Sequence, residues 1–417
     1  MRTSFVERLL AQVDGAVATI WITVIFVLDA LPEAAALDRA AAVFQRETPN
    51  LNRVWRPLPE GWRGAAPVCD GLSGPTRAAD LRGFAEALIA APLDLGVEVP
   101  FRVRYVRCDD GTAAVALQLH HAAGDGRALM FASRRFWALV RDPESPTARL
   151  GAPGFCDRGV ASWVARAPMA ALGVLNPASR VLARRGHALA RRGPPSSPRW
   201  AALSASRPGG VAHDVASGLF YAALVNAAYA VDADLARRHP LRLRVPVDLR
   251  AAMGLGPAIE NACSAVPIEL DRARVEGLVA DPAAYAARVP EAIREALGRG
   301  GHRATALECL VASKLADAAR LRAHVRPDLE APVRANTLVT TYVGRADRYT
   351  DTAASPMRAV LTHTPTLGAN GLTHGGALMF NLSAFAPMWS RDDLDRALDA
   401  ATRCLEDHFQ CTVTRWI

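Results

Sequence analysis

The chain has 417 residues, of which 51% are hydrophobic and 22% are charged. This composition is typical of a globular protein and excludes a disordered or fibrous chain. A single hydrophobic core does not grow to this length, so we expect two domains or two large subdomains. The seven cysteines include no C-x-x-C pair, which argues against a zinc ribbon or a disulfide framework and favours a reducing cytoplasm.

The formal net charge of +8 is concentrated in one region. Nine arginines and no acidic residue lie between Arg158 and His213, so the rest of the chain is nearly neutral. The basic character is therefore local and does not indicate a general affinity for polyanions. Without interleaved aromatic side chains to stack on bases, these arginine-rich stretches predict no nucleic-acid binding.

The first half of the chain reads as strand, helix, helix, hairpin and helix. The apolar run 16–28 is shorter than the roughly 20 residues that span a bilayer, and its β-branched and aromatic residues favour a buried strand. A signal peptide is the alternative, but no small-residue cleavage site follows. The predicted elements are a strand over 17–28, helices over 33–46 and 77–89, a half-exposed strand over 101–105, a buried strand over 113–119 and a helix over 127–141.

The second half follows a stretch rich in proline, glycine, serine and arginine that extends from 142 to 210. Within that stretch, the run 193–198 is the clearest linker. Strand and helix patterns alternate again after it. The predicted elements are a helix over 215–230, strands over 241–247 and 262–270, helices over 282–299 and 305–322, strands over 338–342, 357–361 and 377–383, and a helix over 392–409.

Two adjacent histidines end the buried strand at 113–119. His120 and His121 are followed, after a short turn, by Asp125 and Gly126. Because side chains alternate along a strand, only one of the two histidines can face a given cavity. A neutral imidazole suits a general base at physiological pH. An isolated histidine pair is more often a satisfied core element, but the acid and the glycine at this spacing favour a catalytic role.

This His-His-x-x-x-Asp-Gly run resembles the signature of the condensation-type acyltransferase superfamily. That group includes chloramphenicol acetyltransferase, the condensation domains of nonribosomal peptide synthetases and wax ester synthase-like acyltransferases. The resemblance implies an α/β fold with mixed sheets, in which two chloramphenicol-acetyltransferase-like halves form a V-shaped pseudo-dimer with a tunnel between them. The corresponding divisions here are 1–192 for the half with the histidines, 193–212 for a linker and 213–417 for the second half.

The resemblance also implies roles for individual residues. It makes His121 the general base that acts on the acceptor, with His120 and Gly126 supporting its position. It makes Asp125 a structural acid that pairs with an arginine of the second half, although the position of Asp125 also allows a second catalytic group. Arg250 ends a run similar to the Pro-Val-x-x-Arg of the family and is the expected partner; a solvent-exposed arginine after a strand is the alternative.

Three more residues are candidates for substrate binding. Asn261 lies where the family has a Gly-Asn pair, with Glu260 in place of the glycine. Thr340 and Thr341 lie in a run similar to Ser-Asn-x-Gly-Arg near the tunnel, where a hydroxyl would suit an oxyanion donor. A threonine pair is also ordinary strand composition. The Asp-Phe-Gly-Trp-Gly segment of some relatives is missing, and the apolar strand at 378–383 resembles wax-synthase-like members.

We therefore expect a free-standing acyltransferase of natural-product or lipid biosynthesis. Its donor would be acyl-CoA or an acyl group on the phosphopantetheine arm of a carrier protein, and its acceptor a small molecule with a hydroxyl or an amine. No bound cofactor and no metal are expected, because the histidines lack metal-ligand spacing. The alternative is a catalytically silent condensation-like domain that recruits carrier proteins, although such domains tend to lose the histidines kept here.

The arginine-rich region 158–213 bears on the expected partners. Its charge fits an acidic acyl or peptidyl carrier protein, the phosphates of CoA or peripheral contact with an anionic membrane. A solvated linker is the alternative interpretation. Nothing in the sequence requires more than a cytoplasmic monomer.

Overall fold

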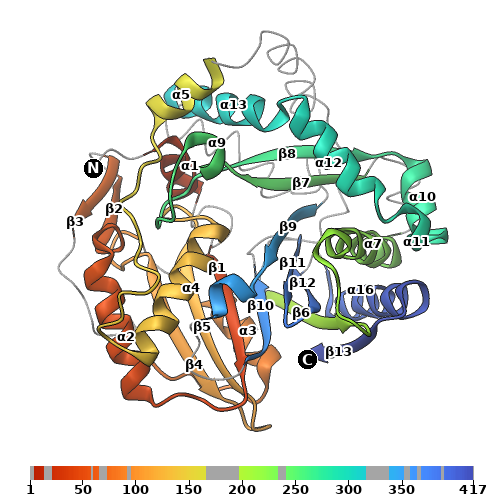
Figure 1. Cartoon of the computed structure of the whole chain (residues 1–417), viewed down its shortest axis with the longest axis horizontal. Helices are drawn as coiled ribbons and strands as arrows, with labels where there is room; N and C mark the ends of the chain where they lie inside the picture. Colours follow the sequence, from red (N-terminus) through yellow and green to blue (C-terminus); the bar gives the residue numbers. More distant parts are fainter. Residues whose placement is uncertain are drawn as a thin grey trace.

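Two large β-sheets, each covered by helices, make up most of the molecule (Figure 1). In the described residues the strands form a four-stranded sheet, a seven-stranded sheet and a two-stranded hairpin. Each large sheet carries its own hydrophobic core, so the predicted mixed α/β architecture is confirmed. The structure, a computed structural model, describes residues 4–13, 21–57, 60–64, 73–91, 95–165, 197–232, 241–315, 338–351, 357–363, 368–386 and 389–416.

The four-stranded sheet, in the order β10-β1-β5-β4, is antiparallel throughout. Its two central strands, β1 and β5, are buried along their whole length. Strands buried on both faces read as continuous apolar runs, which is why both were visible in the sequence. The elements around this sheet are β1 (Trp21–Leu28), α2 (Ala34–Glu47), α3 (Leu81–Ala90), β4 (Phe101–Arg107), β5 (Ala113–His120), α4 (Gly126–Arg141) and β10 (Met357–His363).

Strand β4 is more buried than its alternating sequence predicts. We expected Arg102 and Arg104 to face solvent, but Arg102 is buried. Its Nε donates a hydrogen bond of 2.6 Å to Oε1 of Gln118, its Nη2 donates one of 2.8 Å to the carbonyl oxygen of Ala91, and its guanidinium lies 5.3 Å from the ring centre of Trp21. A buried charge is tolerated where its donors are satisfied. The prediction of a half-exposed strand is therefore wrong at Arg102.

The seven-stranded sheet, in the order β13-β6-β12-β11-β9-β7-β8, is mixed, because β9 runs parallel to β11 and β7. Helices α7 and α16 lie side by side against it (Figure 1). Phe220 of α7 packs against Tyr342 and Phe380 of the sheet, with ring centres 5.9 and 5.7 Å away. The elements are β6 (Ser197–Ser206), α7 (His213–Val231), β7 (Leu241–Asp248), β8 (Cys263–Leu270), β9 (Leu338–Arg345), β11 (Gly368–His374), β12 (Ala377–Ala386), α16 (Arg391–Arg403) and β13 (Thr412–Trp416).

Two strands join the sheets more closely than the predicted division suggests. Strand β10 comes from the second half of the sequence but pairs with β1 in the first sheet. Strand β6 lies within 193–212, where we expected a linker. Trp200 and Ala202 of β6 belong to the first core, whereas Ala201 and Leu203 belong to the second. Unlike β1 and β5, this strand contains proline, serines and alanines and no β-branched residue, so its sequence does not read as a strand.

Shorter elements surround the two sheets. The helix expected over 282–299 is divided into α11 and α12, and the helix expected over 392–409 is divided into α16 and a π-helical turn, η3. No helix within the described ranges is long and apolar enough to cross a lipid bilayer. The remaining elements are α1 (Phe5–Val13), η1 (Pro49–Leu51), β2 (Arg53–Pro57), β3 (Glu60–Gly64), α5 (Asp157–Ala165), α9 (Arg250–Met253), α10 (Arg272–Ala280), α11 (Pro282–Tyr285), α12 (Arg288–Gly298), α13 (Gly301–Leu315), α15 (Asp347–Thr350) and η3 (Cys404–His408).

Candidate active site

The two adjacent histidines have different environments. His120, the last residue of β5, is fully buried, and the backbone N–H of Ala122 donates a hydrogen bond of 3.1 Å to its Nδ1. The edge of its ring meets Trp21, with ring centres 5.2 Å apart. His121 follows the strand and is only partly buried. The alternation expected along the strand therefore leaves His121 as the histidine that a substrate can approach.

The turn after the histidines needs a glycine that we did not single out from the sequence. A Cβ at Gly124 would lie 2.6 Å from Cδ2 of Leu119 and 3.0 Å from Cβ of Ala128, which is closer than side-chain atoms pack. A Cβ at Gly126, by contrast, would meet no atom within 4 Å. The tight packing of the turn against α4 thus depends on Gly124, and the signature glycine Gly126 faces open space.

Asp125 joins three elements through its two carboxylate oxygens. Its Oδ1 caps α4 by accepting a hydrogen bond of 2.8 Å from the backbone N–H of Ala128. Its Oδ2 accepts hydrogen bonds of 2.9 Å from Nη1 of Arg250 and of 2.9 Å from the backbone N–H of Ala262. Both oxygens are committed to the protein, so the geometry fits a structural acid and leaves no oxygen for a second catalytic group.

Arg250, the partner suggested by the sequence resemblance, is 3% exposed and does not extend into solvent. Its Nη1 also lies 3.0 Å from Oδ1 of Asp248, and its Nη2 donates a hydrogen bond of 2.7 Å to the carbonyl oxygen of Glu260. Burial lowers the pKa of the Arg250 guanidinium, but Asp125 and Asp248 raise it more, so the net pKa lies above the usual range. This ion pair holds the histidine turn against the loop that follows α9.

Asn261 contacts His121 directly. Its Nδ2 donates a hydrogen bond of 2.6 Å to the carbonyl oxygen of His121 and lies 3.0 Å from Nδ1 of the His121 ring. The Sγ of Cys263 donates to Oδ1 of Asn261 at 2.9 Å, and burial raises the pKa of that thiol, which keeps its proton in place. The thiol therefore fixes the amide with Nδ2 toward His121. We expected Asn261 to bind substrate; the structure places it against the candidate base, and its contact with substrate stays a prediction.

The environment of His121 favours a neutral ring. Burial lowers its pKa below the usual value, while Asp125 and the hydrogen bond of the ring to the carbonyl oxygen of His121 itself act in the opposite direction. The net effect is a lowered pKa, so the ring is unprotonated at neutral pH. A neutral imidazole with one free nitrogen can accept a proton from a hydroxyl or an amine.

The two candidate threonines of β9 face opposite sides of the sheet. Thr340 is fully buried and, like Tyr342, lies on the face toward α7. Thr341 is partly exposed and lies on the other face with Val343, which packs against the first core. In the described part of the chain, no hydrogen bond joins either threonine to the histidine run. No contact that the structure describes joins these threonines to His121, so their expected role at the substrate stays a prediction.

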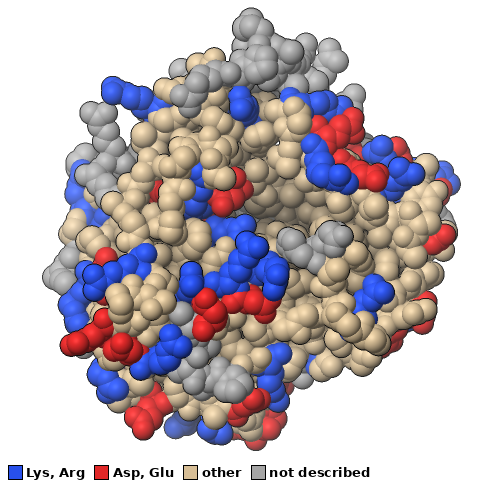
Figure 2. Space-filling view, viewed as in Figure 1, with Lys and Arg blue, Asp and Glu red and all other residues tan. Residues whose placement is uncertain are grey.

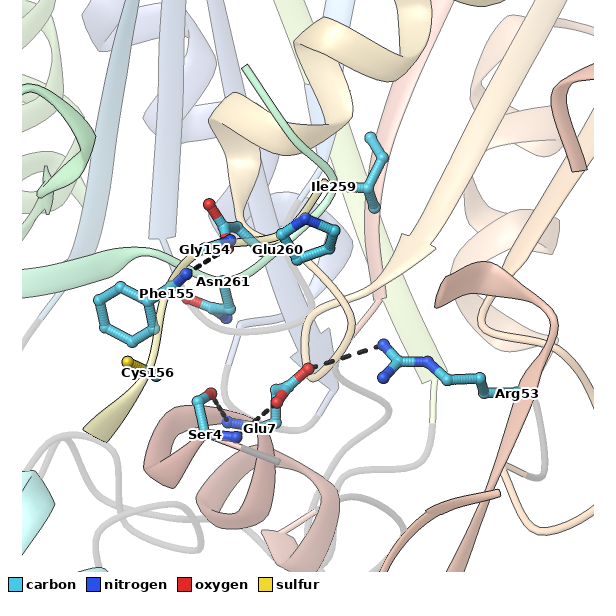
Figure 3. A pocket seen from close by; sticks show the side chains of 10 residues that line it. Ser4, Glu7, Arg53, Gly154, Phe155, Cys156, Ile259, Glu260 and Asn261 are labelled. Atoms are coloured by element: carbon cyan, nitrogen blue, oxygen red, sulfur yellow. Dashed lines mark hydrogen bonds and ion pairs between the residues drawn. The ribbon is translucent and has the colours of Figure 1, made fainter. Parts of the chain in front are cut away.

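Asn261 also lines a cavity of about 150 Å³ (Figure 3). Its walls come from α1, from Arg53 of β2, from the segment 153–156 and from the loop 259–261. Glu7 of α1 lies 3.7 Å from the guanidinium of Arg53. Burial raises the pKa of the Glu7 carboxyl, and the nearby Glu260 acts in the same direction. The sequence analysis missed this cavity, although Ser4 and Glu7 have the S-x-x-E spacing of a helix start, and the backbone N–H of Ser4 does donate to Glu7.

Other predicted features are only partly described. The described residues contain no group of three or more histidine, cysteine or acidic side chains able to hold a metal ion. Most of the arginine-rich region lies in 166–196, outside the described residues, so its expected carrier-protein or membrane contact stays a prediction.

Figure 2 shows the face of Figure 1 hollowed near its centre, with charges of both signs along the rim. The predicted tunnel itself also stays a prediction.

Comparison with known proteins identifies the fold. The sequence matches no family model, and a search of curated proteins gives no match. Among solved structures, the TRI3 trichothecene 15-O-acetyltransferase of Fusarium sporotrichioides is similar, with a TM-score of 0.67 and 12% identity over 97% of this chain and 94% of that one. The TRI101 protein of F. sporotrichioides, solved with coenzyme A and T-2, has a TM-score of 0.57 and 12% identity over 98% and 99%.

A condensation domain is also similar. The first condensation domain of the calcium-dependent antibiotic synthetase, solved with a substrate analogue, has a TM-score of 0.59 and 16% identity over 97% of this chain and 96% of that one. Acetyltransferases and condensation domains thus share the fold of nearly the whole chain. The condensation-type acyltransferase fold predicted from the histidine motif is confirmed.

Proposed function

We propose that the chain transfers an acyl group from a thioester to a hydroxyl or an amine, with His121 as the general base. The observation that carries this proposal is the setting of His121: a partly accessible ring of lowered pKa, fixed by Asn261 from the second half of the sequence. The shared fold with acetyltransferases and condensation domains supports acyl transfer as the class of reaction. Fold alone does not determine function, so the site carries the argument.

In the proposed reaction, the acceptor gives its proton to Nε2 of His121 as its oxygen or nitrogen attacks the thioester carbonyl. The tetrahedral intermediate then collapses, the carbon–sulfur bond breaks, and the leaving thiolate takes the proton from His121. This role needs Nε2 unprotonated and the proton on Nδ1. The hydrogen bond of the ring to the carbonyl oxygen of His121 supports that tautomer. Nδ2 of Asn261 then donates to the same carbonyl oxygen at 2.6 Å, and its 3.0 Å contact with the protonated Nδ1 is not a hydrogen bond.

The intermediate also needs a donor for its oxyanion. Of the two threonines suggested by the sequence, we propose Thr341, because Thr340 points toward α7 and is fully buried. The donor substrate would be acyl-CoA or a phosphopantetheine-bound acyl group on a carrier protein. The coenzyme A in the similar TRI101 structure supports the first of these.

The test is thiol release by wild type and His121→Ala. Acyl-CoAs and acyl N-acetylcysteamine thioesters serve as donors, so that a carrier-dependent enzyme also has a usable substrate, and alcohols and amines serve as acceptors. We expect acceptor-dependent release that falls at least about a hundredfold in the variant, the usual contribution of a general base. His408→Ala, on η3, is the matched control and keeps full activity. Equal rates in His121→Ala and wild type would exclude this mechanism and leave the recruiting domain as the better interpretation.

A further inference from the structure

The thiol of Cys263 holds the amide oxygen of the residue that contacts the candidate base. Its Sγ donates a hydrogen bond of 2.9 Å to Oδ1 of Asn261, and no other described residue donates to that oxygen. Asn261 is 1% exposed. A buried acceptor that loses its donor costs free energy, so the thiol favours one orientation of the amide. In this orientation Oδ1 faces Cys263 and Nδ2 faces His121.

The strand pairing fixes where the thiol lies. Cys263 is the first residue of β8, and its partner on β7 is Asp248. Asp248 in turn lies 3.0 Å from Nη1 of Arg250. On the other side of the thiol, the backbone N–H of Leu249 donates to the carbonyl oxygen of Ala262 at 2.8 Å. The ladder and the ion cluster that hold the histidine turn therefore also hold the thiol.

The other end of the amide acts on His121. Nδ2 of Asn261 donates at 2.6 Å to the carbonyl oxygen of His121, the same oxygen to which the ring is hydrogen-bonded. If the amide turned over, its oxygen would take the place of Nδ2, 2.6 Å from that carbonyl oxygen and 3.0 Å from Nδ1 of the ring. The two oxygens would repel, because neither carries a proton. An oxygen beside Nδ1 would also favour the protonated ring, which cannot act as a base.

We propose that Cys263 is a positioning residue for the acyl transfer, because its thiol acts through Asn261 to keep the His121 ring neutral and in place. This inference rests on the proposed acyl transfer and adds a residue to it. Burial raises the pKa of the Cys263 thiol, so the proton that it donates stays on the sulfur. The residue therefore acts as a hydrogen-bond donor and not as a nucleophile. A hydroxyl can replace the thiol in this role, and a hydrocarbon side chain cannot.

The first test compares Cys263→Ser, which keeps a donor, with Cys263→Val and Cys263→Ala, which remove it with and without filling the space. We expect kcat for thiol release to fall about fivefold in the last two at unchanged KM, the effect of one hydrogen bond, and to stay within about twofold of wild type in Cys263→Ser. Cys411→Val is the matched control, because this buried thiol contacts only the carbonyl oxygen of Phe409 among the described residues, and it keeps full activity. Equal losses in all three Cys263 variants would overturn the inference.

A double-mutant cycle tests whether the effect passes through Asn261. Cys263→Ala should lower kcat in the wild-type background and have no further effect on kcat in the Asn261→Ala background, because the amide that it positions is gone. The same loss in both backgrounds would overturn the inference, since it would assign the effect of Cys263 to packing alone.

A third measurement needs no turnover. NMR titration of protein with labelled histidines gives the pKa of the His121 ring. We expect this pKa to rise in Cys263→Val, where the amide oxygen can turn toward Nδ1, and to stay the same in Cys263→Ser. Asp125 and His120, the other titratable groups that act on the ring, are kept in every variant. A raised pKa without thiol release by wild type would remove only the proposed acyl transfer, whereas thiol release with an unchanged pKa in Cys263→Val would remove only the role of Cys263.

Discussion

Asp125 and Glu260 are both buried carboxylates close to His121, but they are satisfied to different degrees. Both oxygens of Asp125 are occupied, by Ala128, Arg250 and Ala262. Glu260 has partners on Oε2 alone. A buried acid with both oxygens paired links several elements, whereas an unpaired buried oxygen contributes no contact and costs desolvation free energy. The contrast separates an acid on which the fold depends from one that anchors a loop through a single oxygen.

The largest expected effect is on Asp125. Asp125→Asn keeps the shape of the side chain but leaves the buried guanidinium of Arg250 without its main counter-charge. Breaking a buried pair on one side costs about 3 kcal/mol or more, so the free energy of unfolding should fall by that amount. Urea denaturation followed by circular dichroism measures it. A variant that unfolds at the wild-type urea concentration would contradict the structural role of the pair.

The turn between the histidines and α4 should respond next. Gly124→Ala places a Cβ 2.6 Å from Leu119 Cδ2, and such overpacking costs about 1–3 kcal/mol. Gly126→Ala is the matched control, because its Cβ meets open space, and it should unfold close to wild type. Urea denaturation of the two variants shows which has the lower free energy of unfolding, and we expect it to be Gly124→Ala. A reversed order would show that the conformation at Gly126, and not the packing at Gly124, limits this turn.

Sequence reasoning reached the parts of the site that have a local pattern. The histidine run stands out because one strand, one turn and one helix start carry all of it within seven residues, from His120 to Gly126. The resemblance of a short run after a strand to the family motif implied Arg250 as the partner of Asp125, and the structure places its Nη1 2.9 Å from Asp125. The residues alone would not have paired these two side chains, which are 125 positions apart.

The rest depends on contacts that no local pattern records. The cavity wall combines α1, β2, the segment 153–156 and the loop 259–261, which are far apart in sequence. In the sequence, Glu260 stands where the family has a glycine, and it was noted only as a difference from the motif. Its role in the fold comes from hydrogen bonds that it accepts from the backbone N–H groups of Gly154 and Phe155, over 100 residues earlier. Strand β6 was missed for a different reason, since its proline, serines and alanines are not typical of a strand.

The contact between Asn261 and His121 predicts a change in the pH dependence of activity. The pKa of His121 is lowered in the folded chain, so the base stays neutral as the pH falls and kcat/KM declines only below the usual histidine pKa. Asn261→Asp places a negative charge beside Nδ1, which favours the protonated ring. The acid limb of the kcat/KM profile should move upward by about one pH unit. Asn261→Ala, which adds no charge, is the control, and an equal shift in both variants would exclude this electrostatic cause.

The smallest expected effect is on the stability of Glu260→Gln, and it completes the comparison with Asp125. The glutamine Oε1 can accept the hydrogen bonds from Gly154 and Phe155, so the loop keeps its anchors. These two hydrogen bonds become weaker because the glutamine is neutral, but the substitution also removes the cost of burying a charge that has no ion-pair partner among the described residues. The two effects oppose each other, so the free energy of unfolding should change by less than about 1 kcal/mol. Urea denaturation beside Asp125→Asn tests this directly. A loss as large as that of Asp125→Asn would make Glu260 a second structural acid, because an unpartnered oxygen contributes no contact to the folded protein.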